Sequence, residues 1–244
     1  MYTKEFKEIV EKGVNEHFYI GTGNPNAKIL FVGKEAGIDE FTDEDGIINY
    51  ALNAKSWKKH IVDSTCETLN YIPSKDIPKE RALRMAGHTW RKYQILHNNI
   101  YLKEKNKDSK IDFLENVFTT EMNDSPSKRT QPAQQKKDFE KKLKERRNNF
   151  FISDYIQNFP VIVLACSNYI KNDNNVRQID DTFNVKYCKC EDTKGQPFWV
   201  HYNDDRSKLV IHTHQLSGAI SNDLLKEMGK VIRKFMIEKG YIKE

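Results

Sequence analysis

Four short runs of this sequence consist almost entirely of apolar or β-branched residues and do not alternate with polar ones. They span residues 27–32, 117–120, 160–165 and 208–211, and stretches with helical spacing lie between them. Strands buried on both faces produce such runs, and helical connections between them are typical of parallel sheets. The sequence therefore predicts an α/β protein: a three-layer α/β/α sandwich around a central, mainly parallel four-stranded sheet.

The segments between these runs complete the predicted architecture. Apolar residues spaced three and four apart predict helices, and one short helix is expected after the third run. Residues 182–204 differ, because two β-rich runs flank a polar turn and indicate a hairpin inserted at the sheet edge. We expect one domain over residues 1–244, with an N-terminal helical segment at 1–24. The predicted helices span residues 3–17, 49–62, 79–102, 134–158, 168–171 and 222–239.

Composition limits the classes of protein that this chain can belong to. The 244 residues are 31% charged and 38% hydrophobic, and no apolar run is long enough to span a membrane. The N-terminus has no apolar signal region, so we expect a cytoplasmic protein. The four cysteines suit a reducing compartment. Cys188-Lys-Cys190 has no partner pair at metal-binding spacing, so we expect neither a zinc nor an iron–sulfur site.

Polar residues follow the predicted strands. The carboxyl ends of parallel strands share one edge of the sheet, where ligands bind in open α/β folds. Leu216 is unusual there, as a large aliphatic side chain in a polar turn. A hydrophobic cap on the following helix is one interpretation of it. We expect this edge to gather Glu35, Glu121, Asn123, Asn168, His212, His214, Leu216 and Ser217.

Positive charge is concentrated in one stretch of the chain. Residues 128–147 hold nine Lys or Arg against three Asp or Glu, an excess of six, whereas the whole chain has a net charge of +5. A basic face of this kind can follow the phosphates of a nucleic acid. An ordinary solvated helix face is the alternative.

The order and spacing of these loops resemble the uracil-DNA glycosylase superfamily, chiefly its bacterial branches. The first matching motif reads Leu30-Phe-Val-Gly-Lys-Glu-Ala-Gly37, and the last reads His212-Thr-His-Gln-Leu-Ser217. Between them, the runs at 117–123 and 161–165 are similar to the family's second and third strands. The resemblance covers roughly residues 25–240 as an arrangement. It implies hydrolysis of the N-glycosidic bond of a damaged or deaminated DNA base, without a cofactor or metal, by a monomer that flips the base.

The resemblance also implies roles for individual residues. Glu35 would stabilise the cationic sugar or orient water, and His212 would donate a hydrogen bond to the departing base. Leu216 would be the wedge that fills the vacated space in the duplex. The implied base-binding residues are Lys34, Glu121, Asn123 and, for stacking, Tyr50. The DNA contacts expected in the last loop are Leu216, Ser217 and His214, and Lys128 and Arg129 are expected to contact DNA from the basic stretch.

Several positions depart from the family pattern and leave other functions open. Lys34 stands where the family has Gln or Glu, and Glu121 stands where it has Asn. An ionised Glu121 accepts hydrogen bonds but donates none, which does not suit O4 of uracil. A non-catalytic nucleic-acid-binding or nucleotide-binding relative is therefore one alternative. A metal-dependent hydrolase is another, in which the His212-x-His214 pair acts with His201, Asp204 or Asp205.

Overall fold

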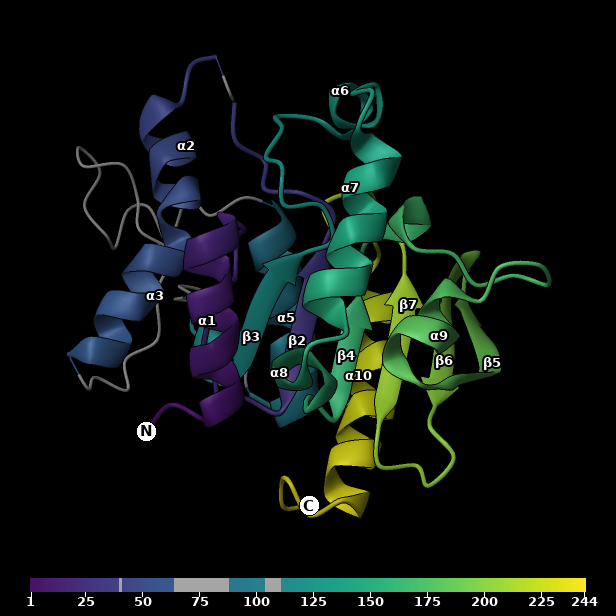
Figure 1. The fold of residues 1–244 in the computed structure, drawn as a ribbon. Coiled ribbons are helices and arrows are strands. Elements are labelled where there is room, and N and C mark those ends of the chain that lie inside the picture. Colours follow the sequence, from purple (N-terminus) through teal and green to yellow (C-terminus); the bar gives the residue numbers. More distant parts are fainter. Residues whose placement is uncertain (40, 64–87, 104–110) are drawn as a thin grey trace.

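A computed structural model describes residues 1–39, 41–63, 88–103 and 111–244 of the chain. The protein is a mixed α/β structure with a seven-stranded sheet in the order β1-β3-β2-β4-β7-β6-β5 (Figure 1). The strands are β1 (Thr22–Gly23), β2 (Ile29–Gly33), β3 (Val117–Glu121), β4 (Val161–Leu164), β5 (Lys186–Thr193), β6 (Gln196–Tyr202) and β7 (Leu209–Thr213).

The four apolar runs of the sequence form strands that lie side by side. β2 pairs in parallel with β3 and with β4, and β4 pairs in parallel with β7. The sheet is wider than the four strands that the sequence predicts, because antiparallel strands extend both sides. β1 pairs with β3, and the predicted hairpin joins the other side through β6 on β7. The hairpin begins at Lys186 and not at residue 182, since the preceding residues form helix α9.

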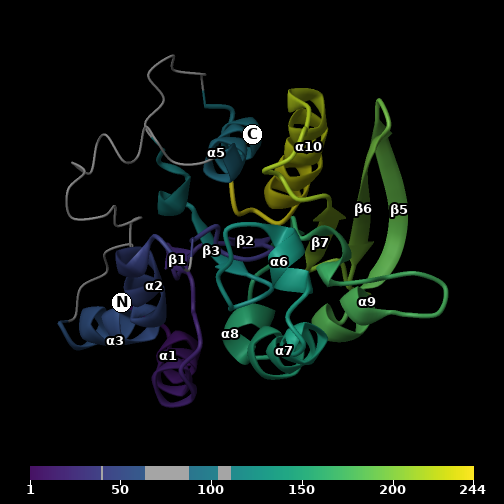
Figure 2. The same cartoon turned by 90° about the horizontal axis from the view of Figure 1, so that it is seen from above.

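Helices lie on both faces of this sheet. Figure 2 shows α1, α7, α8 and α9 on one side and α5 and α10 on the other. None of the helices in the described residues is long and apolar enough to cross a bilayer. The α-helices are α1 (Lys4–Glu16), α2 (Glu44–Ala51), α3 (Asn53–Val62), α5 (His88–Tyr101), α6 (Thr130–Gln134), α7 (Phe139–Arg146), α8 (Asp154–Gln157), α9 (Gln178–Phe183) and α10 (Asn222–Glu238); η1 (Phe113–Glu115) and η3 (Ser167–Tyr169) are 3-10 helices, and η2 (Arg147–Phe151) is a π-helix.

Each face of the sheet has its own apolar core. Leu30 and Val32 of β2 pack toward α1, α7 and α8, whereas Ile29 and Phe31 of the same strand pack toward α5 and α10. Successive side chains of a strand point to opposite faces, so a strand covered on both sides needs apolar residues at every position. This requirement explains the continuous apolar runs in the sequence.

The prediction of one long helix over residues 134–158 is wrong, because several shorter helices form there. A π-helix over Arg147–Phe151 interrupts it, and α8 starts separately after Ser153. The wider turn buries Phe150 and Phe151 together in the core. Similarly, the helix expected at 49–62 is two helices, and the first begins early because Asp43 accepts a hydrogen bond from the amide of Gly46.

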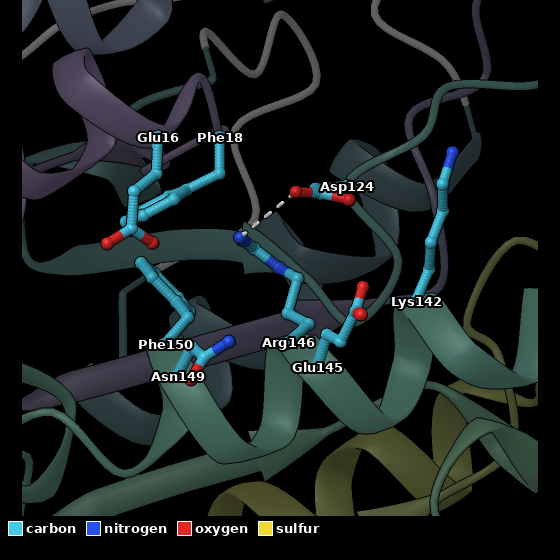
Figure 3. Close-up of a pocket in the computed structure, with 8 residues that line it drawn as sticks. All are labelled: Glu16, Phe18, Asp124, Lys142, Glu145, Arg146, Asn149 and Phe150. Atoms are coloured by element: carbon cyan, nitrogen blue, oxygen red, sulfur yellow. Dashed lines mark ion pairs between the residues drawn. The ribbon is translucent and has the colours of Figure 1, made fainter.

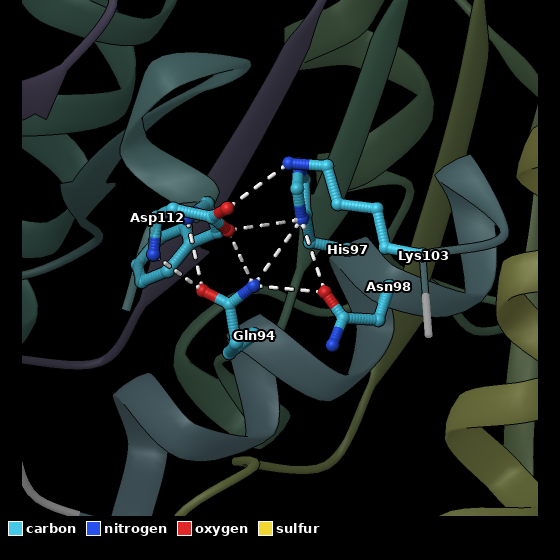
Figure 4. Close-up of polar contacts among 6 residues, drawn as sticks. Gln94, His97, Asn98, Lys103 and Asp112 are labelled. Carbon is cyan, nitrogen blue, oxygen red and sulfur yellow. Dashed lines mark hydrogen bonds and ion pairs between the residues drawn. The ribbon is translucent and has the colours of Figure 1, made fainter. Parts of the chain in front are cut away.

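A polar network fixes the position of α5 on the sheet. The side-chain oxygen of Gln94 accepts hydrogen bonds from the backbone amides of Asp112 and Phe113, at 2.8 and 2.9 Å. Its amide nitrogen donates to Asp112 and Asn98 (Figure 4). Burial lowers the pKa of the neighbouring His97 to about 4, so this imidazole is neutral at pH 7. The sequence predicts that this helix starts at residue 79, but residues 79–87 lie outside the described part of the chain.

Candidate active site at the carboxyl ends of the parallel strands

Loops that follow three different strands converge on the carboxylate of Glu35. Glu35 lies two residues after β2 and is half-buried. Its Oε1 accepts a hydrogen bond from the hydroxyl of Thr130 at 2.9 Å, and its Oε2 accepts one from the phenol of Tyr169. Thr130 comes from the chain after β3, and Tyr169 from the helix after β4. The Thr130 hydroxyl also lies 3.4 Å from Oε1 of Gln215, in the loop after β7.

His212 lies on the same edge of the sheet but is the fourth residue of β7, one position inside the strand. Its Nε2 lies 2.8 Å from the carbonyl oxygen of Ser167. A carbonyl only accepts, so Nε2 carries the proton and Nδ1 is an acceptor. Burial lowers the pKa of His212 to about 4, which keeps the ring neutral. The only N–H of this ring is thus directed at Ser167, so the arrangement differs from the implied donor to a departing base.

Glu35 and His212 contact the same short segment, residues 167–169, although no hydrogen bond joins them directly in the described structure. Ser167 accepts from His212 through its carbonyl and from the amide of Gln215 through its hydroxyl, at 2.9 Å. Tyr169 donates to Glu35. The backbone of Ser167 is left-handed, with φ of 48°, which shows how closely this turn is constrained. The expected pair therefore lies on one edge, bridged by the turn after β4.

Glu121, the last residue of β3, occupies the space that a side chain at Gly33 would fill. A Cβ added to Gly33 would lie 2.1 Å from Oε2 of Glu121, so any larger residue at position 33 would displace this carboxyl group. This oxygen is buried and has no hydrogen-bond partner within the described residues. Burial, with a smaller contribution from the negative charge of Glu35, raises the pKa of Glu121 to about 8, and Arg146 opposes the shift. A pKa near 8 keeps Glu121 mostly protonated at pH 7, whereas the sequence left its protonation state open.

Arg146 holds the carboxyl end of β3 through hydrogen bonds, a role that the sequence did not reveal. Its Nε donates to the carbonyl of Glu121 at 2.9 Å and its Nη2 to the hydroxyl of Thr120 at 3.1 Å. Its Nη1 lies 3.7 Å from Asp124 (Figure 3). The residue is only 5% exposed, and its guanidinium lies 4.0 Å from the centre of the Phe150 ring. One signal was present, since Phe139, Leu143, Arg146 and Phe150 follow one another at helical spacing on an apolar face.

The other implied base-binding residues are near this edge but are engaged with the protein. Lys34 is buried with its ammonium 4.9 Å from the centre of the Tyr169 ring, and burial lowers its pKa. Asn123 is buried, and its side-chain oxygen accepts from the amide of Ser125. Tyr50 stacks on Tyr19 with 4.1 Å between ring centres. One face of Tyr50 is thus already covered.

Leu216 does not project from the protein as an exposed wedge would. Its exposed fraction is 0%, and it packs in the core formed with Ile220 and Leu224 at the start of α10. This observation favours the hydrophobic-cap interpretation, and contact with a duplex would require the loop to open. Ser217 is half-buried, and His214 is exposed with its ring 6.0 Å from that of Trp199.

The basic stretch offers fewer available charges than its composition indicates. Arg146 is buried, and the exposed Arg129 precedes α6. Paired cations attract phosphate less strongly, because a carboxylate already neutralises them. Besides the buried Arg146, three of the nine basic residues in this stretch pair with carboxylates, as Lys128–Asp39, Lys141–Glu145 and Lys142–Asp138.

The alternative of a metal-dependent hydrolase requires a set of metal ligands, and the described part of the chain does not contain one. No group of three or more His, Cys, Asp or Glu side chains is placed there to hold a metal ion. His201 is directed at Asp180, while Asp204 pairs with Lys186 and Asp205 accepts from Ser207. The residues proposed for a metal site thus have other partners.

Comparisons with known proteins returned no relative. A scan against protein-family models gave no match. Searches of curated proteins and of solved structures gave none either. A function for this chain is therefore inferred from the geometry of the site and from the resemblance of the motifs.

Proposed function

We propose that this protein hydrolyses the N-glycosidic bond of a damaged or deaminated base in DNA, within a three-layer α/β/α architecture. One observation carries the proposal: two carboxyl groups, Glu35 and Glu121, lie at the ends of the neighbouring strands β2 and β3 in contrasting environments. Pairs of carboxyls with contrasting environments are a common basis for acid–base and electrostatic roles. A monomeric state and a cytoplasmic location stay predictions from the sequence.

Glu35 would act on the sugar. Cleavage of the bond develops positive charge on the sugar ring, and a nearby carboxylate stabilises that charge or orients the attacking water. The hydroxyls of Thr130 and Tyr169 hold this carboxylate from both oxygens. Their hydrogen bonds fix its direction before a substrate arrives, which reduces the reorganisation needed in the transition state.

Glu121 would read the base. A protonated carboxyl offers one O–H donor and one carbonyl acceptor, as a side-chain amide offers both kinds of group. Oε2 of Glu121 is buried without a hydrogen-bond partner among the described residues, which supports a role in binding a ligand that forms a hydrogen bond there. In this state Glu121 suits the O4 and N3–H edge of uracil, which an ionised carboxylate would not. Uracil and bases with a similar edge are the proposed substrates.

A non-catalytic nucleic-acid-binding protein is the second candidate, and two observations favour it. His212 directs its N–H at Ser167, and Leu216 is buried. Both residues would have to rearrange for the mechanism that the resemblance implies. In the non-catalytic case, DNA would bind at the same edge without loss of a base.

Incubation of the protein with oligonucleotides that contain uracil, hypoxanthine or xanthine tests the proposal. Alkaline strand cleavage reveals abasic sites, in single-stranded and duplex substrates separately. We expect cleavage at uracil, and a loss of it in Glu35→Gln with DNA binding retained. Binding without abasic sites across the whole panel would overturn the enzymatic proposal in favour of the second candidate.

A further inference from the structure

A cavity lies beside β6 and β7, on the sheet face covered by α9. Its volume is about 290 Å³, near the small end of the ~300–1,000 Å³ typical of ligand sites. A cavity of this size accommodates one ring system with part of a sugar. Trp199 and His201 line it from β6, His212 from β7 and Tyr187 from β5, and residues 172–174 and 177 line it from the segment before α9.

The position of His201 is fixed by a carboxylate. Its Nδ1 lies 3.1 Å from Oδ1 of Asp180, and the same oxygen accepts from the side-chain amide of Asn172 at 3.0 Å. The carboxylate only accepts, so Nδ1 carries the proton of the neutral ring and Nε2 is an acceptor. His201 is 1% exposed, and its Nε2 has no hydrogen-bond partner among the described residues. A buried acceptor of this kind is costly unless a ligand or water supplies a donor.

His212 adds a second acceptor to the same cavity. Because Nε2 of His212 donates to Ser167, its Nδ1 has a lone pair available. Burial lowers the pKa of His212 and that of His201, so both rings stay neutral at pH 7. Trp199 pairs with His212 across the strands, and their ring centres are 5.3 Å apart. The cavity therefore combines two imidazole acceptors with a large aromatic surface.

We propose that this cavity binds an unmodified nucleobase that carries an exocyclic amino group, presented on a nucleotide. Amino groups supply the N–H donors that two neutral imidazoles require. Thymine instead presents carbonyl oxygens on both sides of its single N–H, and these oxygens would face acceptors. Stacking on a tryptophan is a general mode of base recognition. The guanidinium of Arg177 is 48% exposed at the rim and lies 3.8 Å from the carboxylate of Asp180, so a phosphate there would share this cation with Asp180.

The cavity shares His212 with the proposed catalytic edge, but neither Glu35 nor Glu121 lines it. It would bind an ordinary base of a strand or a free nucleotide and would not cleave it. The proposal does not depend on glycosylase activity, so either can fail without the other.

Calorimetric titration with dAMP, dCMP, dGMP and dTMP tests the specificity. We expect the three amino-bearing nucleotides to bind at least tenfold more tightly than dTMP. A short single-stranded oligonucleotide of cytosines distinguishes the source: tighter binding than dCMP identifies a strand, and equal binding identifies a free nucleotide. Equal affinity for all four nucleotides, or no binding of any, would overturn the proposal.

Variants locate the binding site. Trp199→Leu should weaken dCMP binding at least tenfold, whereas Tyr241→Leu, at an exposed tyrosine outside the cavity, should leave it unchanged. His201→Gln would remove one of the two acceptors, but it can also disturb folding. The imidazole resonances of the wild-type protein therefore provide a second measurement. The signals of His201 and His212 should shift when dCMP is added. Unchanged binding in Trp199→Leu, or unchanged signals, would contradict the assignment.

Discussion

Two regions of the sheet bury ionisable groups with opposite consequences. At the ends of β2 and β3, burial raises the pKa of the Glu121 carboxyl and creates a hydrogen-bond donor at neutral pH. Beside β6 and β7, burial lowers the pKa values of His201 and His212 and leaves acceptors. The physical cause is the same, since a low-dielectric environment disfavours whichever form is charged. One fold can therefore present complementary recognition chemistry at two neighbouring places.

The largest expected effect concerns Glu35. Glu35→Gln should reduce base release about a thousandfold, because the amide cannot stabilise a positively charged sugar. Single-turnover cleavage assays measure this, and Glu140→Gln on the exposed surface of α7 is the matched control. If Glu35→Gln keeps full activity, the carboxyl ends of β2 and β3 do not form the catalytic site.

Removal of Arg146 should cause the largest loss of stability. Arg146→Met leaves the carbonyl of Glu121 and the hydroxyl of Thr120 without their donor, so we expect a loss of about 3–5 kcal/mol in the free energy of unfolding. Urea denaturation measures it. Lys144→Met, at an exposed position of the same helix, should change stability by less than about 0.5 kcal/mol. Equal effects of the two substitutions would show that Arg146 is only a surface charge.

Leu216→Ala tests whether the loop after β7 is part of the core. Deletion of a fully buried leucine should lower the free energy of unfolding by about 2–4 kcal/mol. Leu102→Ala, at a largely exposed position, is the control. A small change in stability together with a selective loss of activity on duplex DNA would instead support a wedge.

The pH dependence of stability tests the state of Glu121. Its pKa is about 8 in the folded protein, against a model-peptide value near 4.5 for the unfolded chain. Between these values the folded state holds one more proton, so its contribution to stability decreases as pH rises, by at most roughly 1.4 kcal/mol per pH unit. Glu121→Gln should remove this slope and keep activity above pH 8. A slope identical to that of the wild type would show that Glu121 is ionised.

The smallest effect should come from the basic stretch. Arg129→Ala should weaken DNA binding and reduce the slope of affinity against salt by about 1, whereas Lys128→Ala should do less because Asp39 already pairs with that ammonium. Fluorescence anisotropy at several salt concentrations gives both slopes. A larger effect of Lys128→Ala would mean that its ion pair opens when DNA binds.

Several details of the site follow from long-range neighbours that no local pattern encodes. The pKa of Glu121 is raised because the fold buries this carboxyl beside Gly33 and near Glu35, residues 88 and 86 positions earlier in the chain. Arg146 looked like one more cation in a basic stretch, yet its partners Thr120 and Glu121 belong to a strand. Leu216 could be read as a wedge or a cap, and packing against α10 favours the cap.

The sequence by itself determined the buried strands, the hairpin and the polar residues that follow the strand ends, because two-sided burial demands unbroken apolar runs. Only the tertiary structure decided which groups are charged, which hydrogen-bond donors are already used and which side chains are buried. Those properties depend on neighbours that come from distant parts of the chain. The solvation of a side chain depends on these neighbours and not on its residue type alone.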